Sequence, residues 1–243
     1  MKNIILAAAM LAIGTGAALA DGHGKIIRLG TEGAYAPYNF LNDDGEVDGF
    51  ERELGDELCK RAELKCEWVT NDWDSIIPNL VSGNYDAIIA GMSVTDERKK
   101  VIDFSENYTQ PDPSVYLVAM DDVDVETAVI AAQSGTIQAS HIADMEGATL
   151  LEFATPEETV AAVRNGEADA VLADKAFLAP LAEAESELSL MEQDVLIGGG
   201  IGMGLRQSDT ELRDMFTAAI QSMKEDGSLN VLIEKWLPES ATF

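Results

Sequence analysis

Short runs rich in apolar side chains alternate with longer amphipathic stretches along the chain. Residues 25–30, 66–70 and 86–90 each have the length and composition of a strand. Residues 50–62 and 74–81 repeat apolar positions at helical spacing, and the aspartate that opens the second stretch is expected to cap its helix. Strands that alternate with helices indicate an α/β fold.

The second half of the chain repeats this order. The run TPEE at residues 155–158 combines a capping box with proline at the first helical position, which predicts a helix start. Residues 80–90 (LVSGNYDAIIA) and 163–173 (VRNGEADAVLA) match in spacing, because each predicts a helix, a glycine that stops it and an apolar strand. Any α/β protein contains such units, but one in each half indicates two lobes of similar build.

The ends of the two matching strands locate a site. Open α/β sheets bind ligands beyond the carboxyl ends of their strands. Here those ends lead to residues 91–93 (GMS) and to Asp174. We therefore expect a binding site between the lobes, with the chain crossing from one lobe to the other near residues 110–113 and 193–196.

The last part of the chain predicts two further helices. The run SDTE at residues 208–211 has the spacing of another capping box and predicts a helix to about residue 226. Gly227 is expected to stop this helix, and residues 228–236 predict a short amphipathic one.

The first twenty residues are organised as an export signal. Lys2 supplies a positive charge, residues 4–13 form a short apolar stretch, and residues 18–20 (ALA) offer a cleavage site between small residues. The alternative is a membrane anchor, but the strongly apolar run is shorter than the about 20 residues that span a bilayer. We expect a cleaved signal peptide at residues 1–20, a periplasmic mature protein and no insertion into the membrane.

The chain is strongly acidic. It has 16 lysines and arginines against 44 aspartates and glutamates, a net charge of −28. Such a surface repels nucleic acid and anionic lipid, so neither is expected as a partner. A general adaptation for solubility explains most of this charge, although the acidity also suits cationic solutes.

Cys59 and Cys66 are the two cysteines of the chain. An even number of cysteines in an exported protein favours a disulfide. A metal site would need more ligands, and His23 and His141 are far away in sequence. Because catalytic redox pairs are usually separated by two residues, we predict a structural disulfide.

The sequence lacks the common motifs of nucleotide and metal enzymes. The run GGGIGMG at residues 198–204 does not satisfy the dinucleotide-binding pattern at any starting glycine, and no phosphate-binding loop occurs. Residues 121–124 (DDVD) lack the glycine and glutamate of a calcium loop. We expect no cofactor, no metal site and no enzymatic activity.

Several short motifs, taken in this order, resemble the periplasmic amino-acid-binding proteins that serve ABC importers, which form family 3 of the solute-binding proteins. The nearest members are those for lysine, arginine, ornithine, histidine and octopine, and the resemblance covers nearly the whole mature chain. Besides the cysteine pair, the motifs are GTEGAYAP at 30–37, DGF at 48–50, WDSIIP at 73–78, MSVTDER at 92–98, IDFS at 102–105, SGT at 134–136, DAVLAD at 169–174 and GMGLR at 202–206.

This resemblance implies a two-lobed periplasmic-binding-protein fold of type II. Each lobe is then a mixed sheet flanked by helices, and two hinge strands join the lobes. The first lobe is expected to be discontinuous, at residues 21–111 and 197–243, and the second to span residues 112–196. The resemblance also implies a monomer that closes around a free α-amino acid and passes it to a membrane ABC permease.

An α-amino acid is a zwitterion, so its receptor needs a cation and an anion. Arg98 is suited to grip a carboxylate through two parallel hydrogen bonds. The sequence alone favours a surface salt bridge with Asp96 or Glu97 instead, and the family resemblance reverses that preference. Asp174 is placed to accept the ammonium group, and its alternative role is an ordinary helix cap.

Other groups of the backbone-binding site follow from the resemblance. The turn at residues 134–136 opens a helix, where N–H groups would add donors for the carboxylate. Ser93 and the carbonyl of Gly91 would share the ammonium with Asp174. The resemblance thus places Gly91, Ser93, Arg98, Thr136 and Asp174 on the family's backbone-binding positions.

Recognition of the ligand side chain falls to Glu32, Tyr35 and Trp73. Flat aromatic rings are suited to sandwich an aliphatic stem or a guanidinium group, and Glu32 would pair with a distal cation. Core packing is the alternative for the two aromatic residues, and turn polarity is the alternative for Glu32. The acid favours a cationic ligand such as arginine, ornithine, lysine, histidine or an opine.

An enzyme and a ligand-sensing module are the two alternatives to an amino-acid receptor. A periplasmic enzyme on the same scaffold, such as a cyclohexadienyl-type dehydratase, would turn over prephenate-like acids. A ligand-sensing module would be joined to a signalling segment, and the sequence carries none.

Overall fold

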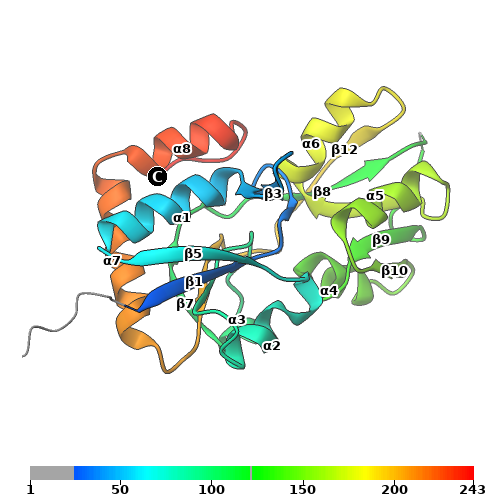
Figure 1. Cartoon of the computed structure of the whole chain (residues 1–243). Coiled ribbons are helices and arrows are strands. Elements are labelled where there is room, and N and C mark those ends of the chain that lie inside the picture. The colour runs from blue at the N-terminus through cyan, green and yellow to red at the C-terminus, as the bar shows by residue number, and fades with distance from the viewer. Residues whose placement is uncertain (1–24, 121) are drawn as a thin grey trace, which may run out of the picture.

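The computed structural model describes residues 25–120 and 122–243, which form two lobes that lie side by side (Figure 1). Each lobe is built on a five-stranded sheet with helices packed against it. The signal peptide predicted at residues 1–20 lies outside the described residues. Among the helices of the described parts of the chain, none is long and apolar enough to cross a membrane.

The first lobe contains both the start and the end of the described chain. Its elements are β1 (Ile26–Thr31), β2 (Ala34–Tyr35), β3 (Asn39–Leu41), β4 (Val47–Asp48), α1 (Phe50–Arg61), β5 (Lys65–Thr70), the 3₁₀ helix η1 (Trp73–Ser75), α2 (Ile76–Val81), β6 (Ala87–Ile88), α3 (Asp96–Lys99), β7 (Asp103–Asn107), β13 (Gly202–Leu205), α7 (Thr210–Glu225) and α8 (Ser228–Trp236). The sheet order is β5-β1-β6-β13-β7, in which β1 is parallel to its neighbours and β13 is antiparallel to its own. Leu29, Leu54 and Phe216 are fully buried in the core that the sheet shares with α1 and α7.

The second lobe is one continuous stretch of chain. Its elements are β8 (Ser114–Val118), β9 (Val129–Gln133), α4 (Ile137–Ala143), β10 (Thr149–Phe153), α5 (Pro156–Arg164), β11 (Ala170–Asp174), α6 (Lys175–Ala184) and β12 (Ser189–Val195). The sheet order is β10-β9-β11-β8-β12, and β8 runs antiparallel to both of its neighbours. Successive residues of β9 enter opposite cores, Ile130 on one face and Ala131 on the other, because side chains alternate along a strand. The predicted α/β fold with two lobes and mixed sheets is confirmed.

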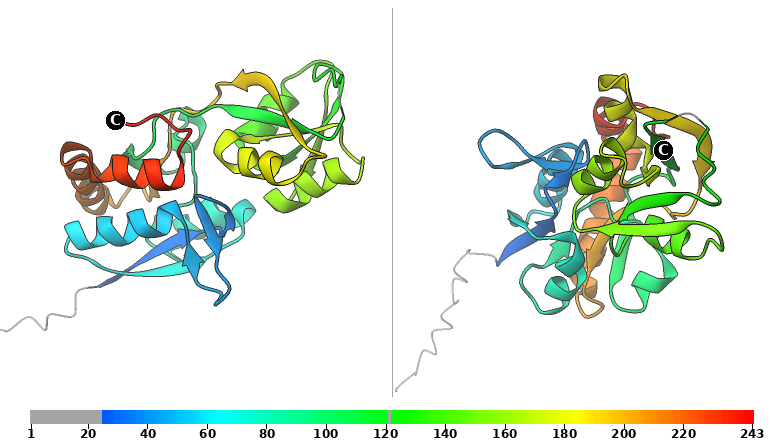
Figure 2. Two further views of the ribbon diagram at one scale, coloured as in Figure 1. Left: turned by 90° about the horizontal axis from the view of Figure 1, so that it is seen from above. Right: turned by 90° about the vertical axis from the view of Figure 1, so that its right-hand side faces the viewer.

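Two connections join the lobes, one between β7 and β8 and one between β12 and β13. They lie next to each other, because the backbone N–H of Tyr108 donates to the carbonyl of Ile201 at 2.8 Å. Seen from above, the lobes lie on either side of these connections, and α7 and α8 belong to the first lobe (Figure 2). The predicted lobe limits, at 111–112 and 196–197, fall in these connections and stay a prediction as limits of moving bodies.

The predicted start of a helix at residues 155–158 and two predicted glycine stops agree with the structure. Thr155 and Glu158 form both hydrogen bonds of the predicted capping box at the start of α5. Gly166, just beyond the end of α5, has a left-handed φ of 73°, and Gly83 has the same conformation after α2, with φ of 83°. The predicted glycine stops are therefore confirmed in both lobes.

Two predicted helix caps in the first lobe were wrong. Ser75, not Asp74, occupies the cap position of α2, and the Asp74 carboxylate instead accepts a hydrogen bond from the Ser134 hydroxyl at 2.9 Å. At α7 the cap position is Asp209, which makes no side-chain capping bond, and the Ser208 hydroxyl donates to Asp209. In both cases another acceptor or donor competes for the capping side chain, and sequence spacing does not reveal that competitor.

Cys59 and Cys66 form the predicted disulfide. Cys59 lies near the end of α1, and Cys66 is the second residue of β5, so the bond joins a helix to the edge strand of the sheet. The Cα atoms are 6.2 Å apart, which is within the usual range for disulfides. The bond is at the end of the sheet opposite to the cleft.

Candidate functional site

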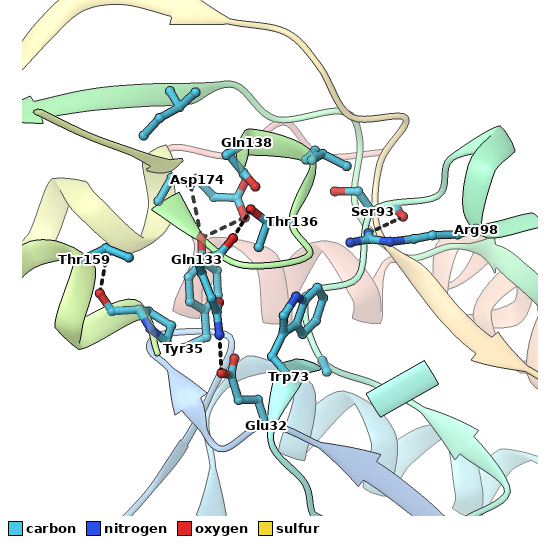
Figure 3. Close-up of a pocket in the computed structure, with 16 residues that line it drawn as sticks. Glu32, Tyr35, Trp73, Ser93, Arg98, Gln133, Thr136, Gln138, Thr159 and Asp174 are labelled. Carbon is cyan, nitrogen blue, oxygen red and sulfur yellow. Dashed lines mark hydrogen bonds between the residues drawn. The ribbon is translucent and has the colours of Figure 1, made fainter. Parts of the chain in front are cut away.

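All eight residues predicted from the sequence line one pocket between the lobes (Figure 3). Four of them follow directly from strand ends or helix starts: Glu32 comes after β1, Gly91 lies beyond β6, Thr136 caps α4, and Asp174 ends β11. The carboxyl ends of these strands therefore meet at the cleft, as open α/β sheets require. The predicted residues that line the pocket are Glu32, Tyr35, Trp73, Gly91, Ser93, Arg98, Thr136 and Asp174.

Arg98 is held by backbone carbonyls from both lobes. Its Nη1 donates to the Ser93 carbonyl at 2.9 Å, and its Nη2 donates to the Gly135 carbonyl at 3.3 Å. The alternative reading, a surface salt bridge with Asp96 or Glu97, was wrong, because Arg98 forms no ion pair with any side chain that the structure describes. The guanidinium group is thus oriented by neutral acceptors and keeps its charge uncompensated.

The surroundings of Arg98 also disfavour its charge. Burial lowers the pKa of Arg98 to about 10, and the negative charge of Asp174 offsets only part of this effect. The guanidinium carbon lies 5.3 Å from the centre of the Trp73 ring, within range of a cation–π contact. Trp73 lines the pocket and also packs in a hydrophobic cluster of the first lobe.

Asp174 is held by donors from both lobes. Its carboxylate accepts hydrogen bonds from the Tyr35 hydroxyl and the Gln138 amide, both at 2.9 Å, and a longer one from the Ser114 hydroxyl at 3.5 Å. Although Asp174 stands at the cap position of α6, its side chain makes no capping bond. Burial raises the pKa of Asp174 to about 6, against the hydrogen bonds that lower it.

Glu32 lies at the other end of the pocket from Asp174 (Figure 3). Its Oε1 accepts a hydrogen bond from Nε2 of Gln133 at 2.6 Å. Burial, together with the negative charges of Asp72 and Asp74, raises the pKa of Glu32 to about 7, although the Gln133 hydrogen bond opposes this rise. The pocket thus has an acidic end that no cation of the described residues neutralises.

Tyr35 belongs to an aromatic stack that crosses the cleft. Its ring lies 4.5 Å from the ring of Phe177 in the second lobe and 5.8 Å from that of Tyr38 in the first, nearly parallel to both. Its hydroxyl donates to the Asp174 carboxylate and accepts from the Asp174 backbone N–H. Tyr35 therefore holds Asp174 in place besides lining the pocket.

The smaller predicted residues shape the pocket through their backbone. The Thr136 hydroxyl donates to the Gln133 carbonyl at 2.7 Å and accepts from the Ala139 N–H at 3.1 Å, so it fixes the start of α4. Gly91 has a left-handed φ of 60°, and its peptide turns at the pocket wall. Ser93 follows two residues later and lines the same wall.

Two glutamines of the pocket were missed by sequence reasoning. Gln133 ends β9 and binds Glu32, while Gln138 lies in the first turn of α4 and binds Asp174. They are 8% and 5% exposed. The sequence offered one signal, because the two glutamines flank the turn at residues 134–136. Gln133 lies at the strand end before this turn and Gln138 at the helix start after it, and both positions face the cleft.

Among the described residues, hydrogen bonds join four pairs of residues across the cleft, so the lobes are closed upon each other. They join Tyr35 to Asp174, Glu32 to Gln133, Asp74 to Ser134, and Arg98 to Gly135. Three of the four involve residues of the predicted site, and the fourth lies at its rim.

Comparison with known proteins identifies the family of the chain. A profile of the bacterial extracellular solute-binding proteins, family 3, matches residues 27–239. The lysine/arginine/ornithine-binding periplasmic protein of Escherichia coli (strain K12) is 29% identical over 259 residues, an alignment that covers 97% of this chain and 97% of that protein. The family resemblance that the sequence motifs predict is confirmed.

Solved structures show the same fold. The crystal structure of a periplasmic His/Glu/Gln/Arg/opine family-binding protein from Silicibacter pomeroyi in complex with lysine is 66% identical in sequence, with a TM-score of 0.87 over 89% of this chain and 100% of that one. The ancestral amino acid-binding protein AncCDT-1, a precursor of cyclohexadienyl dehydratase, is 31% identical, with a TM-score of 0.77 over 87% of this chain and 94% of that one.

Proposed function

The chain belongs to family 3 of the bacterial extracellular solute-binding proteins, and we propose that it is a periplasmic receptor that closes around a free α-amino acid with a cationic side chain. One observation carries the proposal. Arg98 and Asp174 line the same pocket, burial shifts the pKa of both, and neither has an ion-pair partner among the described side chains. A buried charge is costly without a partner, and the backbone of an amino acid supplies both partners.

The zwitterion fits between these two groups. The ligand carboxylate would take the free N–H groups of Arg98 and the backbone N–H groups at the start of α4, next to Thr136. The ligand ammonium would donate to Asp174, with the carbonyl of Gly91 and the hydroxyl of Ser93 as further acceptors. Each charged end of the ligand would then meet groups of opposite polarity.

The far end of the pocket favours a cationic ligand side chain. Glu32 has a neutral hydrogen-bond partner, Gln133, and two acidic neighbours, Asp72 and Asp74, that disfavour its ionisation. A guanidinium or ammonium group of the ligand would reverse this balance and stabilise the carboxylate. The ring of Trp73 would flank the aliphatic stem of such a ligand. Arginine, ornithine, lysine, histidine and the opines all fit this description.

Closure of the two lobes would bury the ligand, as hinge motion does in periplasmic binding proteins. We assign the hinge to the two connections between the lobes, with residues 21–111 and 197–243 moving against residues 112–196. Separation of the lobes would break the hydrogen bonds that cross the cleft, so these bonds would add to the energy that the ligand supplies. The closed form would be the one that a membrane permease of the ABC class recognises. We also propose export through the signal peptide at residues 1–20 and action as a monomer.

A titration of the purified protein tests this proposal. The protein should first be unfolded and refolded to remove any bound ligand, and then titrated calorimetrically with arginine, lysine, ornithine, histidine, octopine, glutamine and citrulline. We expect binding of the cationic compounds and weaker binding of glutamine and citrulline. Arg98→Ala should lose binding of all of them, whereas Arg52→Ala, which removes a surface arginine paired with Asp56, should bind as the wild type does. Absence of binding to every compound would refute the proposal.

The second candidate is an enzyme on the same scaffold. It draws support from the likeness to AncCDT-1 and from two pocket carboxyl groups with raised pKa, those of Glu32 and Asp174, because such groups are suited to proton transfer. We favour binding over turnover, since each group already matches one charged end of an amino acid. Incubation with prephenate, followed by detection of product, separates the two, because a receptor leaves the acid unchanged.

A further inference from the structure

A carboxylate without a cation lies directly behind the pocket. Glu51, in the first turn of α1, is fully buried. Its Oε1 accepts hydrogen bonds from the Tyr108 hydroxyl and from the backbone N–H of Gly91, the latter at 2.6 Å. Its Oε2 accepts from Nδ2 of Asn39 at 2.7 Å. Glu51 is not among the residues that line the pocket between the lobes, so nothing in the proposed binding step uses it directly.

The three donors come from three segments that meet only in the folded protein. Tyr108 begins the connection from β7 to β8. Gly91 is the turn residue at the pocket wall. Asn39 in turn accepts from the backbone N–H of Gly33 at 2.7 Å, and Gly33 has a left-handed φ of 74° next to Glu32. Both glycine turns that carry the proposed ligand groups are therefore tied to one side chain.

The hydrogen bonds around Glu51 need an acceptor at each of its oxygens. The Gly91 N–H and the Asn39 amide group can only donate to it, whereas the Tyr108 hydroxyl can donate or accept. Burial raises the pKa of Glu51 above its ordinary value, and the hydrogen bonds from Tyr108, Gly91 and Asn39 offset only part of that rise. The first turn of a helix also favours a negative charge. A buried carboxyl group that is hydrogen-bonded at both oxygens in this way fixes the orientation of its partners.

We propose that Glu51 is a positioning residue of the amino-acid site, which holds the Gly91 peptide directly and the Gly33 turn through Asn39. This inference rests on the proposed function. The carbonyl of Gly91 and the carboxylate of Glu32 then meet the ligand in a fixed arrangement. Because Tyr108 belongs to a connection between the lobes, the same carboxylate links that arrangement to the hinge.

A single isosteric change breaks this network, and a second change restores it. In Glu51→Gln the amide oxygen can accept from Tyr108 and Gly91, but its NH₂ group then faces the NH₂ group of Asn39. Rotating the Asn39 amide moves the conflict to the N–H of Gly33, so no orientation satisfies every group. When Asn39→Asp is combined with Glu51→Gln, the new aspartate can accept from the Gly33 N–H with one oxygen and from the NH₂ group of the new glutamine with the other. The carboxylate then stands at position 39 instead of position 51.

The experiment compares the wild type, Glu51→Gln and the double variant Glu51→Gln/Asn39→Asp. Arginine titrations at 25 °C should show a dissociation constant about 10-fold higher in Glu51→Gln and a return to within about 3-fold of the wild type in the double variant. Hydrogen exchange of the peptides that contain Gly33 and Gly91 should be faster in the single variant and slow again in the double one. This rescue separates positioning from a general loss of stability.

Asp86→Asn is the matched control. Asp86 is 1% exposed, accepts from Lys25, Arg28 and Arg206, and precedes β6 at the end of the sheet opposite to the pocket. Loss of this buried carboxylate should lower the melting temperature and leave the dissociation constant unchanged. A control that weakens binding as much as Glu51→Gln does would show that loss of any buried charge has the same effect, and would overturn the inference.

The outcomes separate this inference from the proposed function. If the wild type binds no amino acid, the proposed function fails, and the exchange of Gly33 and Gly91 still tests the positioning role. If the wild type binds and a folded Glu51→Gln binds equally well, the inference is overturned. If Glu51→Gln does not fold, Tyr108→Phe, which removes one donor and keeps the ring, should weaken binding about 3-fold, and an unchanged dissociation constant in that variant would overturn it.

Discussion

Glu32 allows a test of the charge that the pocket requires in its ligand. The perturbation is pH. Burial and acidic neighbours raise the pKa of Glu32 to about 7, so a large share of the molecules carry a neutral carboxyl at pH 6. A cationic ligand side chain would favour the carboxylate and lower that pKa. The free protein therefore holds more protons than the complex, and affinity should rise with pH.

The magnitude follows from the pKa. Below its pKa, the ionised fraction of a carboxyl falls tenfold for each pH unit. With a pKa of about 7 for Glu32, the carboxylate share rises roughly tenfold between pH 6 and pH 8, and the association constant for arginine should rise by about the same factor. Asp174, with a pKa of about 6, adds a further dependence at lower pH. That second dependence concerns the ammonium group and is shared by every α-amino acid.

The assay is calorimetric titration with arginine and with citrulline, its neutral counterpart, across this pH range. Arginine should bind more tightly at pH 8 and should release roughly one proton per ligand near pH 6.5, measured by comparing buffers of different ionisation enthalpy. Citrulline should show only the roughly twofold rise that ionisation of Asp174 adds between pH 6 and pH 8. Glu32→Gln should bind arginine more weakly at pH 8 and keep only this smaller dependence. An arginine affinity that stays constant or falls from pH 6 to pH 8 would refute the reasoning.

Three further predictions concern other parts of the site and the fold. Arg98→Lys should weaken binding of every α-amino acid by about 10- to 100-fold in calorimetry, because lysine lacks the paired donors for a carboxylate; an effect limited to cationic ligands would contradict this role. Ser134→Ala removes the rim hydrogen bond to Asp74 without changing any charge and should weaken all ligands by about 2- to 5-fold without changing their order, and a changed order would contradict it. Replacing Cys59 and Cys66 by serine should lower the free energy of unfolding by about 2–3 kcal/mol in urea denaturation. The dissociation constant should stay unchanged, since the bond lies far from the cleft, and weaker binding in the folded variant would show that the disulfide also supports the site.

Local sequence signals predicted the elements of the fold well where one segment contains the whole signal. The capping box of Thr155 and Glu158 lies within four residues, and both of its hydrogen bonds form. The glycine stops at Gly83 and Gly166 depend on backbone conformation at one residue. The failure at Asp74 has the opposite cause, because its carboxylate binds Ser134 from the other lobe.

The site was predicted in two steps of different kind. Apolar strands that end in polar residues indicated a cleft with Gly91, Ser93 and Asp174 at its edge, which needs only the general behaviour of α/β sheets. The choice of Arg98 over a surface salt bridge came from family resemblance. The structure then supplied a physical reason, since the guanidinium group turns toward backbone carbonyls instead of its acidic neighbours in sequence.

The sequence by itself determined the alternation of strands and helices, the disulfide and the family, because each depends on short spacings or on motifs in a given order. Only the tertiary structure decided which side chains support the site. Gln133 meets Glu32 across 101 residues, and Glu51 meets Gly91 across 40. Such pairs depend on how two sheets and two lobes come together, and a glutamate or glutamine that will be buried looks, in the sequence, like any other polar residue of an acidic chain.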